Sequence, residues 1–465
     1  MTTMSVQQRR ELGRSKRAAT PRSAHATWEP GPDRADPVAL IEEQNASRLE
    51  WLVPIRHARM SVSPFTFFRG AARVMASDLA GTPSTGLEVQ LGGDAHLSNF
   101  GAYASPERQL VFDQNDFDET LPGPWEWDLK RLATSFVIAG QFHGFSKKHC
   151  GNLAAEVTRS YRRGIAHFAA MGYVQLWYDY VDTDDIRSGA GISSKELDKR
   201  LTRFTRRAEK RTSAQALGKY AERVDGRWRI RHEPPLLFSL SDLPGEMPAG
   251  WTRDELPGAA AAALEAYKGT LDDNRHALLD HYDLVEVGLK VVGVGSVGTR
   301  CLLLLLLGRD DGDPLFLQAK EATNSVLEEF LAPSRYDNHG QRVVEGQRLV
   351  QAQSDIFLGW TIGAPEGRHF YVRQLRDWKG SVDVEAPDTT PEQLGFYAGL
   401  CGLTLARGHA RTGDAEAIAG YVGKGESLDR AIAEFAHAYA ATNLEDHQRF
   451  CAAIEDGTLP CAETA

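Results

Sequence analysis

The chain has 465 residues, of which 42% are hydrophobic and 25% are charged, so it is long enough for two or three domain-sized units of an ordinary globular protein. Its formal net charge of −10 argues against a dedicated nucleic-acid-binding protein, because such domains are usually basic. The longest apolar run, Cys301–Leu307, is far shorter than the roughly 20 residues that span a bilayer. Because the N-terminus also lacks an apolar signal segment, we expect a cytoplasmic protein without a membrane partner.

The first part of the chain predicts a tail followed by helices. Residues 1–35 are polar, rich in arginine and interrupted by proline, which predicts a disordered basic tail. Residues 36–280 predict a mainly helical lobe with a short β insert, in which Ser63–Gly81 forms one helix with Ser63 as its N-cap. We expect a break in the later helices near 189–194. The proline-rich stretch 228–251 predicts an irregular connector between two lobes.

The hydrophobic period changes after residue 280. Residues 283–322 alternate between apolar and other side chains and turn at glycines, which predicts three antiparallel strands. A helix at 340–353 and a strand at 368–378 follow. We therefore expect a β-rich, nucleotide-binding lobe over 281–380, and helices over 381–465 that complete the helical lobe.

The stretch "LGGDAHLSNFG" carries polar side chains that a core strand would not contain. Asp94 precedes Asn99 by five residues, and Asp116 and Asp118 follow at the end of the next predicted strand. Phosphoryl transfer needs a carboxylate that orients the incoming hydroxyl, and amide and carboxylate oxygens that hold Mg²⁺. The alternative is structural: an Asx turn at Asp94, a left-handed Asn99 and a solvated acidic loop.

This stretch resembles the catalytic loop of aminoglycoside phosphotransferases, choline kinases and their kinase-like relatives. The resemblance implies that Asp94 is the catalytic aspartate and that Asn99 binds the metal ion. It also implies that Asp116 is the metal-binding aspartate of a "DF" motif, and that His96 matches a histidine of the family loop. The sequence departs from the family at Gly92, where the family has a histidine that supports the loop.

Other residues near these motifs have less specific roles. "WEWDLKRLA" resembles the segment that follows in those kinases, which implies that Asp128 supports the lobe core. Asp118 is a further candidate metal ligand. Arg69 either contacts a phosphate or acidic substrate, supports the catalytic loop, or lies on a surface helix with an aromatic core face. His409 is either a ligand or part of a helix C-terminus.

A second motif, "GVGSVG", fits the GxGxxG pattern, which alone is a weak signal. Seven apolar residues and the turn "GRDDGD" follow it, which suits a β-hairpin better than the helix of a dinucleotide-binding fold. The hairpin leads to Lys320 on an apolar strand, and the pair resembles the glycine loop and strand lysine of kinases. The alternatives are a tight bend in a sheet and a strand-end lysine in solvent.

We expect Lys320 to pair with Glu345 on the next helix, with Glu328 and Glu329 as other possible partners. The segment "FYVRQLRDW" would be the hinge strand beside the adenine. The predicted nucleotide-binding residues are therefore Gly293, Gly295, Ser296, Gly298, Lys320, Glu345, Arg373 and Gln374.

The predicted catalytic loop precedes the predicted glycine loop, which reverses the order in ordinary kinases. The resemblance therefore implies an α+β, protein-kinase-like fold of two lobes, circularly permuted, with a small antiparallel β lobe for ATP and a large helical lobe. Across residues 50–455 the chain also resembles an uncharacterised bacterial family, domain of unknown function 2252. That resemblance rests on "RMSVSPFTFFRG", "GDAHLSNFG", "NDFDE", "VVGVGSVGTR", "LQAKEA", "GQRLVQAQSD" and "FYVRQLRDWKGS".

These patterns predict a phosphotransferase that uses ATP and Mg²⁺ and acts on a small-molecule or protein acceptor. One alternative is a nucleotidyl transferase or a nucleotide-binding pseudokinase that regulates a partner, because the same residues would bind Mg-ATP. A Rossmann-type NAD(P) oxidoreductase would use "GVGSVG" but would leave Asp94, Asn99 and Asp116 unexplained. The acceptor and the oligomeric state stay open.

Overall fold

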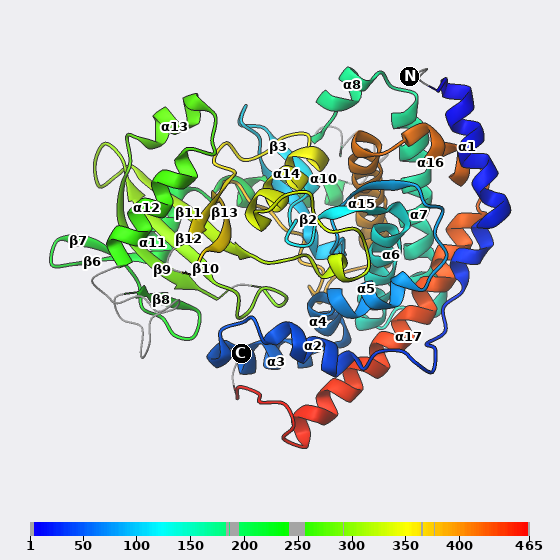
Figure 1. The fold of residues 1–465 in the computed structure, drawn as a ribbon, viewed down its shortest axis with the longest axis horizontal. Helices are drawn as coiled ribbons and strands as arrows, with labels where there is room; N and C mark the ends of the chain where they lie inside the picture. The colour runs from blue at the N-terminus through cyan, green and yellow to red at the C-terminus, as the bar shows by residue number, and fades with distance from the viewer. Residues whose placement is uncertain are drawn as a thin grey trace.

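The computed structural model describes residues 4–182, 186, 195–240, 256–291, 293–363, 366–375 and 377–463. The α+β class is confirmed: one large antiparallel sheet with its helices lies on one side of the molecule, and a helical assembly lies on the other (Figure 1). The helix break expected near 189–194 lies outside the described residues, as does the later part of the expected connector.

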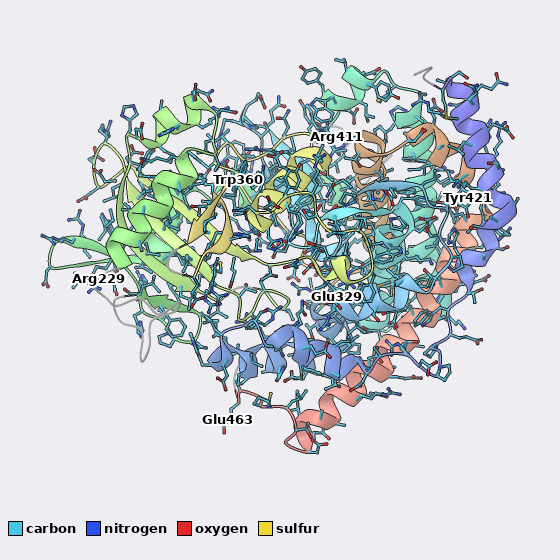
Figure 2. The ribbon with its side chains drawn as sticks, viewed as in Figure 1. Arg229, Glu329, Trp360, Arg411, Tyr421 and Glu463 are labelled. Atoms are coloured by element: carbon cyan, nitrogen blue, oxygen red, sulfur yellow. The ribbon has the colours of Figure 1, made fainter. Side chains whose placement is uncertain are left out.

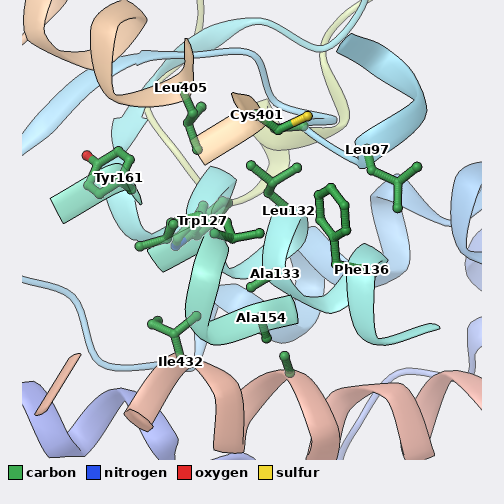
Figure 3. Close-up of a cluster of buried hydrophobic side chains, with 14 of the residues drawn as sticks. Leu97, Trp127, Leu132, Ala133, Phe136, Ala154, Tyr161, Cys401, Leu405 and Ile432 are labelled. Carbon is green, nitrogen blue, oxygen red and sulfur yellow. The ribbon is translucent and has the colours of Figure 1, made fainter. Parts of the chain in front are cut away.

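The helical assembly, called here the helical half, contains segments from both ends of the chain. Helix α15 packs along α7, and α17 packs on both α6 and α7. Figure 3 shows the apolar side chains that these helices bury together. The elements of this half are α1 (Val6–Ala19), α2 (Pro37–Asn45), α3 (Val53–Ser61), α4 (Pro64–Gly70), α5 (Ala72–Ala80), α6 (Trp125–Phe142), α7 (Lys147–Ala169), α8 (Tyr173–Tyr178), α15 (Pro391–Thr412), α16 (Ala415–Val422) and α17 (Ser427–Glu455).

The large sheet has the strand order β12-β13-β11-β10-β9-β8 and is antiparallel throughout. The three strands predicted over 283–322 are confirmed, as are the helix and the strand that follow them. The elements of this sheet half are α11 (Ser213–Tyr220), β8 (Leu237–Ser239), α12 (Leu256–Lys268), α13 (Asp273–Leu279), β9 (Asp283–Lys290), β10 (Cys301–Leu307), β11 (Pro314–Ala322), α14 (His339–Val350), β12 (Gly359–Gly363) and β13 (Arg368–Gln374).

The leucine run of β10 is explained by cover on both faces of the sheet. Leu304 and Leu306 lie in one buried cluster with side chains of α12, whereas Leu303 and Leu305 lie in another with side chains of α11. A strand that is buried on both faces reads as a continuous apolar run rather than an alternating one.

Two short antiparallel pairs position the polar loops that the sequence singled out. Strand β1 (Glu88–Leu91) pairs with β4 (Leu121–Pro124), and β2 (Phe100–Ala104) pairs with β3 (Leu110–Gln114). One loop connects β1 to β2, and a second connects β3 to β4. Each loop therefore runs from one strand pair to the other, and the two loops lie side by side. The amide of Asn115 donates to the carbonyl of Asn99 at 2.9 Å, which fixes this approach.

Smaller elements complete the described chain. Strand β3 also pairs with β5 (Val181–Asp182), and the hairpin of β6 (Ala221–Val224) and β7 (Arg227–Ile230) extends beside the sheet half. Helix α10 (Lys195–Glu209) precedes α11. Within the described residues, no helix is both long enough and apolar enough to cross a membrane.

The expected disordered tail instead contains the ordered helix α1 and a short 3-10 helix at Arg22–Ala26. Helix α1 begins with a capping box of Ser5 and Gln8 and packs against α16. Arg10 pairs with Glu416 at 2.5 Å. The polar composition led to the wrong prediction because α1 is held by polar side-chain contacts and by the close approach of its backbone to α16. Such contacts need few apolar residues.

The helix expected over Ser63–Gly81 is broken into α4 and α5 at Ala71, which has φ −107° and ψ 36°. The buried guanidinium of Arg56 donates to the carbonyl of Gly70 at 3.0 Å. Because the Gly70 carbonyl accepts a hydrogen bond from Arg56, it does not need a backbone amide of a continuing helix as its donor.

The sheet half also begins earlier than residue 280, which the sequence took as the lobe boundary. Strand β8 pairs with β9 at the edge of the sheet, and α12 packs on β12. The connector therefore supplies sheet structure, and α11 to α13 cover the sheet rather than the helical half.

Replacing Gly13 by alanine should destabilise the protein by about 1–3 kcal/mol, because the added Cβ would lie 1.8 Å from the carbonyl oxygen of Ala417. Alanine otherwise gains about 1 kcal/mol over glycine in a helix. The matched control Gly218→Ala in α11, where the Cβ would meet no atom within 4 Å, should be neutral or stabilising. Urea unfolding compares the two, and equal effects would contradict the close packing of α1.

Candidate active site

Asp128 of α6 supports the loop between β1 and β2, residues 92–99. Its carboxylate accepts hydrogen bonds from the backbone amides of Gly92 at 2.7 Å and Gly93 at 3.1 Å. Gly93 has φ 83°, and a Cβ there would lie 2.2 Å from the carbonyl oxygen of Glu119. A Cβ at Gly92 would lie 1.7 Å from the side chain of Gln114. A side chain at Gly92 would therefore require the end of the Gln114 side chain to move.

Asp94 lies at the head of this loop with a strong cationic partner. The guanidinium of Arg131 approaches one Asp94 carboxylate oxygen at 2.5 Å, and His96 Nε2 lies 3.8 Å from the other. Burial raises the pKa of Asp94, and Arg131 opposes that shift. Asp94 is thus a carboxylate in low-dielectric surroundings, oriented by one arginine.

Asn99 is oriented by its own loop. Its side-chain Nδ2 donates to the backbone carbonyl of Asp94 at 2.8 Å. The amide nitrogen is therefore used within the loop, and Asn99 lines the cleft beside Asp94 and Asp116. The amide oxygen is the group left to bind a ligand there.

The acidic loop between β3 and β4 meets a lysine from the sheet half. Lys320 Nζ on β11 lies 3.2 Å from Asp118 and 3.9 Å from Asp116. The hydroxyl of Tyr371 on β13 donates to the other Asp118 oxygen at 2.5 Å. Burial opposes the charged form of Lys320, but Asp116 and Asp118 outweigh it and hold the pKa of Lys320 well above its ordinary value. Asp116 Oδ1 is buried, and no described residue donates a hydrogen bond to it.

The expected partner of Lys320 was wrong. Glu345 contacts Arg348 at 3.2 Å. The other possible partners, Glu328 and Glu329, also contact arginines instead of Lys320. Glu329 lies between the two halves, where it pairs with Arg73 at 2.9 Å (Figure 2). Lys320 instead contacts Asp118 of the acidic loop at 3.2 Å.

The glycine loop joins β9 to β10 and is therefore the turn of a hairpin. Gly293 and Gly298 have φ values of 68° and 90°, which favour glycine. Arg59 donates to the carbonyl of Gly293 at 2.7 Å, and Arg48 donates to the carbonyl of Val297 at 2.5 Å. A dinucleotide-binding motif would have a helix directly after this loop, but strand β10 follows it instead.

One cleft contains residues of both loops and of the glycine loop. Asp94, His96, Asn99, Asp116 and Asp118 line it from the helical half. The residues that line it from the sheet half include Gly293, Gly295, Ser296, Thr299 and Glu321, and the arginines that line it are Arg48, Arg56 and Arg69.

Four other predicted site residues lie away from the opening of this cleft. Arg373 donates to the carbonyl of Asn115 at 3.1 Å, so it supports the acidic loop. Gln374 lies on β13, and its amide donates to Ser213 at 3.3 Å. Gly298 packs against Arg48, where a Cβ would lie 2.9 Å from the arginine side chain. His409 lies 3.4 Å from Asp128 and 2.9 Å from the Tyr161 hydroxyl, within the core below the loop.

The sequence did not single out four residues that shape the site. Arg131 pairs with Asp94, and Tyr371 pairs with Asp118. Arg342 of α14 donates to the carbonyls of Thr120 at 2.7 Å and Asp118 at 2.8 Å. Arg48 holds the glycine loop. Only Arg131 had a local signal, since it lies three residues after Asp128 and therefore on the same face of α6.

The oxygens available at the cleft fit a hard divalent cation such as Mg²⁺. Asn99 offers an amide oxygen and Asp116 a carboxylate oxygen without a hydrogen-bond donor. Asp118 fits less well, because Lys320 and Tyr371 occupy its oxygens. The described residues contain no group of three or more His, Cys, Asp or Glu side chains arranged around a metal. Mg²⁺ needs only one or two carboxylates, because waters and phosphate oxygens complete its shell.

A family model described as an uncharacterised protein conserved in bacteria (DUF2252) matches residues 48–453. The chain therefore belongs to this family, and the matched range includes both loops, the glycine loop and Lys320. No curated protein and no solved structure matches the chain.

Replacing Asp128 by asparagine should loosen the loop that carries Asp94. Asparagine offers one acceptor oxygen, so one of the amides of Gly92 and Gly93 would lose its partner, at a cost of about 1–3 kcal/mol. Hydrogen exchange should become faster at residues 92–99. The exposed control Asp273→Asn in α13 should change neither stability nor exchange of this loop, and unchanged exchange in Asp128→Asn would contradict the supporting role.

Proposed function

We propose that this protein is a phosphotransferase that uses Mg-ATP and transfers the γ-phosphoryl group to a hydroxyl of an acceptor. The observation that carries the proposal is the single cleft in which Asp94, Asn99 and Asp116 face the glycine loop. Lys320 lies against the same acidic loop, although it is 202 residues away from Asp118 in the sequence. Asx turns and surface loops alone give no reason for these groups to converge.

The sheet half has the parts that a kinase-like ATP site needs. The glycine loop connects β9 to β10, the lysine lies on β11, and helix α14 follows before β12 and β13. In kinases a glycine-rich loop covers the phosphates and a lysine of the third strand pairs with them. These correspondences support a kinase-like nucleotide lobe.

The order of the parts supports a circular permutation of that fold. The catalytic loop lies near residue 94 and the glycine loop near residue 293, whereas ordinary kinases have the opposite order. The segments before and after the sheet half pack into one helical half, where α1 contacts α16 and α6 contacts α17. Permutation is tolerated where the two ends of a domain lie close together.

In the proposed reaction, the acceptor hydroxyl oxygen attacks the γ-phosphorus of ATP. A bond forms between these atoms, the bond from the γ-phosphorus to the β–γ bridging oxygen breaks, and ADP leaves. Asp94 orients the hydroxyl and takes its proton. Bound Mg²⁺ would neutralise phosphate charge, with Asn99 and Asp116 as its protein ligands. Lys320 is kept cationic by the acidic loop, so it is ready to pair with phosphate oxygens.

Binding of Mg-ATP tests the nucleotide site. A ligand at 100 times its Kd stabilises the folded state by about 2.7 kcal/mol, so Mg-ATP should raise the Tm of the wild-type protein. Lys320→Ala should lose most of that shift, because the phosphates lose their cation. Lys219→Ala, an exposed lysine of α11 in the same half, is the control and should keep it. Stabilisation by NAD with no response to Mg-ATP would overturn the proposal.

The roles of Asp94 and Asp116 should separate in mutants. Asp94→Asn should keep Mg-ATP binding and lower turnover by ~10²-fold, the scale for loss of a positioned base. Asp116→Ala should lose metal-dependent nucleotide binding as well. Slow ATP hydrolysis serves as the assay before an acceptor is known, with unfolding midpoints to check folding. Full activity in Asp94→Asn would make Asp94 a turn residue, and label transferred from α- rather than γ-labelled ATP would indicate nucleotidyl transfer.

A further inference from the structure

A second cavity opens beside the catalytic cleft. Its volume is about 730 Å³, within the range of roughly 300–1,000 Å³ that small-molecule sites occupy. Arg69 lines both this cavity and the cleft that contains Asp94. Ser98, one residue before Asn99 on the catalytic loop, also lines the second cavity. A molecule in this side cavity would therefore reach the catalytic loop beside Arg69 and Ser98.

The walls of the side cavity have distinct chemistry. Aromatic and aliphatic side chains from three elements form an apolar surface: Phe112 of β3, Phe204 of α10, and Leu394, Phe396, Tyr397 and Leu400 of α15. Arg203 and Arg207 lie one turn apart on α10 and form a basic wall. Three acids of the segment before α15 also line the cavity: Asp383, Glu385 and Asp388.

Three guanidinium groups of this cavity are unpaired. Within the described part of the chain, Arg69 makes no ion pair or hydrogen bond, and its Nε is buried without a partner. Burial lowers the pKa of Arg69, with Glu385 and Asp94 acting in the opposite direction from a distance. Arg203 and Arg207 likewise have no carboxylate within 4.0 Å among the described residues. Arg203 and Arg207 are exposed to solvent and available to bind an anion at the cavity, whereas Arg69 is partly buried between the cavity and the cleft.

In the part of the chain that the structure describes, Asp383 and Glu385 make no ion pair with Arg203 or Arg207, and the carboxylate of Asp383 accepts the backbone amide of Glu385 at 3.3 Å. Arg69 lines both the cavity and the cleft that contains Asp94, so it marks the end of the cavity nearest the catalytic loop. That end suits the acceptor hydroxyl, whereas the end formed by Arg203 and Arg207 suits an anion.

The basic surface continues outside the cavity along α10. Lys199, Thr202, Arg206 and Lys210 line an adjoining surface hollow together with Arg203 and Arg207. A local positive potential of this kind raises the concentration of anions at the mouth of the cavity. It stands out on a chain whose formal net charge is −10.

We propose that this side cavity is the acceptor site, and that the acceptor is a small organic anion, a carboxylate or phosphate, with an apolar or planar body and a hydroxyl at the end away from the anionic group. Arg203 and Arg207 bind the anionic group, the α15 side chains contact the body, and Arg69 stands where the hydroxyl meets the transferred phosphoryl group. The assignment rests on the proposed phosphotransfer.

Two sets of related probes that carry different charges test the acceptor class. The first is 4-hydroxyphenylacetate, its neutral amide and tyramine, and the second is glucose 6-phosphate, glucose and glucosamine. Equilibrium binding to the full-length protein is measured by calorimetry, and phosphorylation with γ-labelled ATP and Mg²⁺. The anionic member of at least one set should bind tenfold or more tighter than its neutral and cationic counterparts.

The arginine pair should account for that preference. Arg203→Ala with Arg207→Ala should weaken binding of the anionic probe tenfold or more and leave Mg-ATP binding unchanged. Arg206→Ala is the matched control, because Arg206 lies on the same helix and lines only the outer hollow. Where the probe is phosphorylated, the double variant should raise KM and leave kcat within about threefold, because Arg203 and Arg207 lie outside the catalytic cleft.

The outcomes separate this proposal from the proposed function. If Mg-ATP binds in a Lys320-dependent manner but neither anionic probe is preferred, or if the preference survives the double variant, the acceptor assignment is wrong and the phosphotransferase proposal stands. If Mg-ATP does not bind, the phosphotransferase proposal fails, and any anion bound by Arg203 and Arg207 is not an acceptor.

Discussion

The buried contact of Lys320 with Asp118 and Asp116 is the interaction on which the arrangement of this molecule depends. A lysine inside a sheet is costly unless carboxylates meet it, and here the carboxylates come from a loop of the other half. Lys320 is almost fully buried, whereas the two carboxylates are partly exposed, so the lysine depends on these acids more than they depend on it. The contact therefore fixes the sheet half against the helical half at the cleft.

The acidic loop is in turn held by two arginines, one at its start and one at its end. Arg342 donates to its backbone carbonyls, and Arg373 does so at its start. Asp128 plays the reverse role for the neighbouring loop, where a carboxylate accepts two glycine amides. Both loops are irregular backbone, and each obtains from charged side chains the partners that regular structure would otherwise supply. This support keeps Asp94, Asn99 and Asp116 in one place.

Arginines also surround the cleft that contains the acids. Arg48 and Arg59 hold the glycine loop by its carbonyls, and Arg69 faces both the cleft and the side cavity. Carboxylates that suit a cation and guanidinium groups that suit phosphate thus line one space.

The sequence by itself determined the elements whose signals are local. Apolar stretches between glycine turns predicted β9 to β11, the region 381–465 was predicted to be helical, and residue types marked the loops at Asp94 and Asp116. Only the tertiary structure decided which charges meet: Lys320 pairs with Asp118 rather than Glu345, and Arg131 reaches Asp94. It also decided that α1 is ordered and that the helix predicted over Ser63–Gly81 is interrupted at Ala71, next to Gly70, whose carbonyl accepts a hydrogen bond from Arg56. Periodicity depends on neighbouring residues, whereas these contacts join residues that the sequence separates and folding brings together.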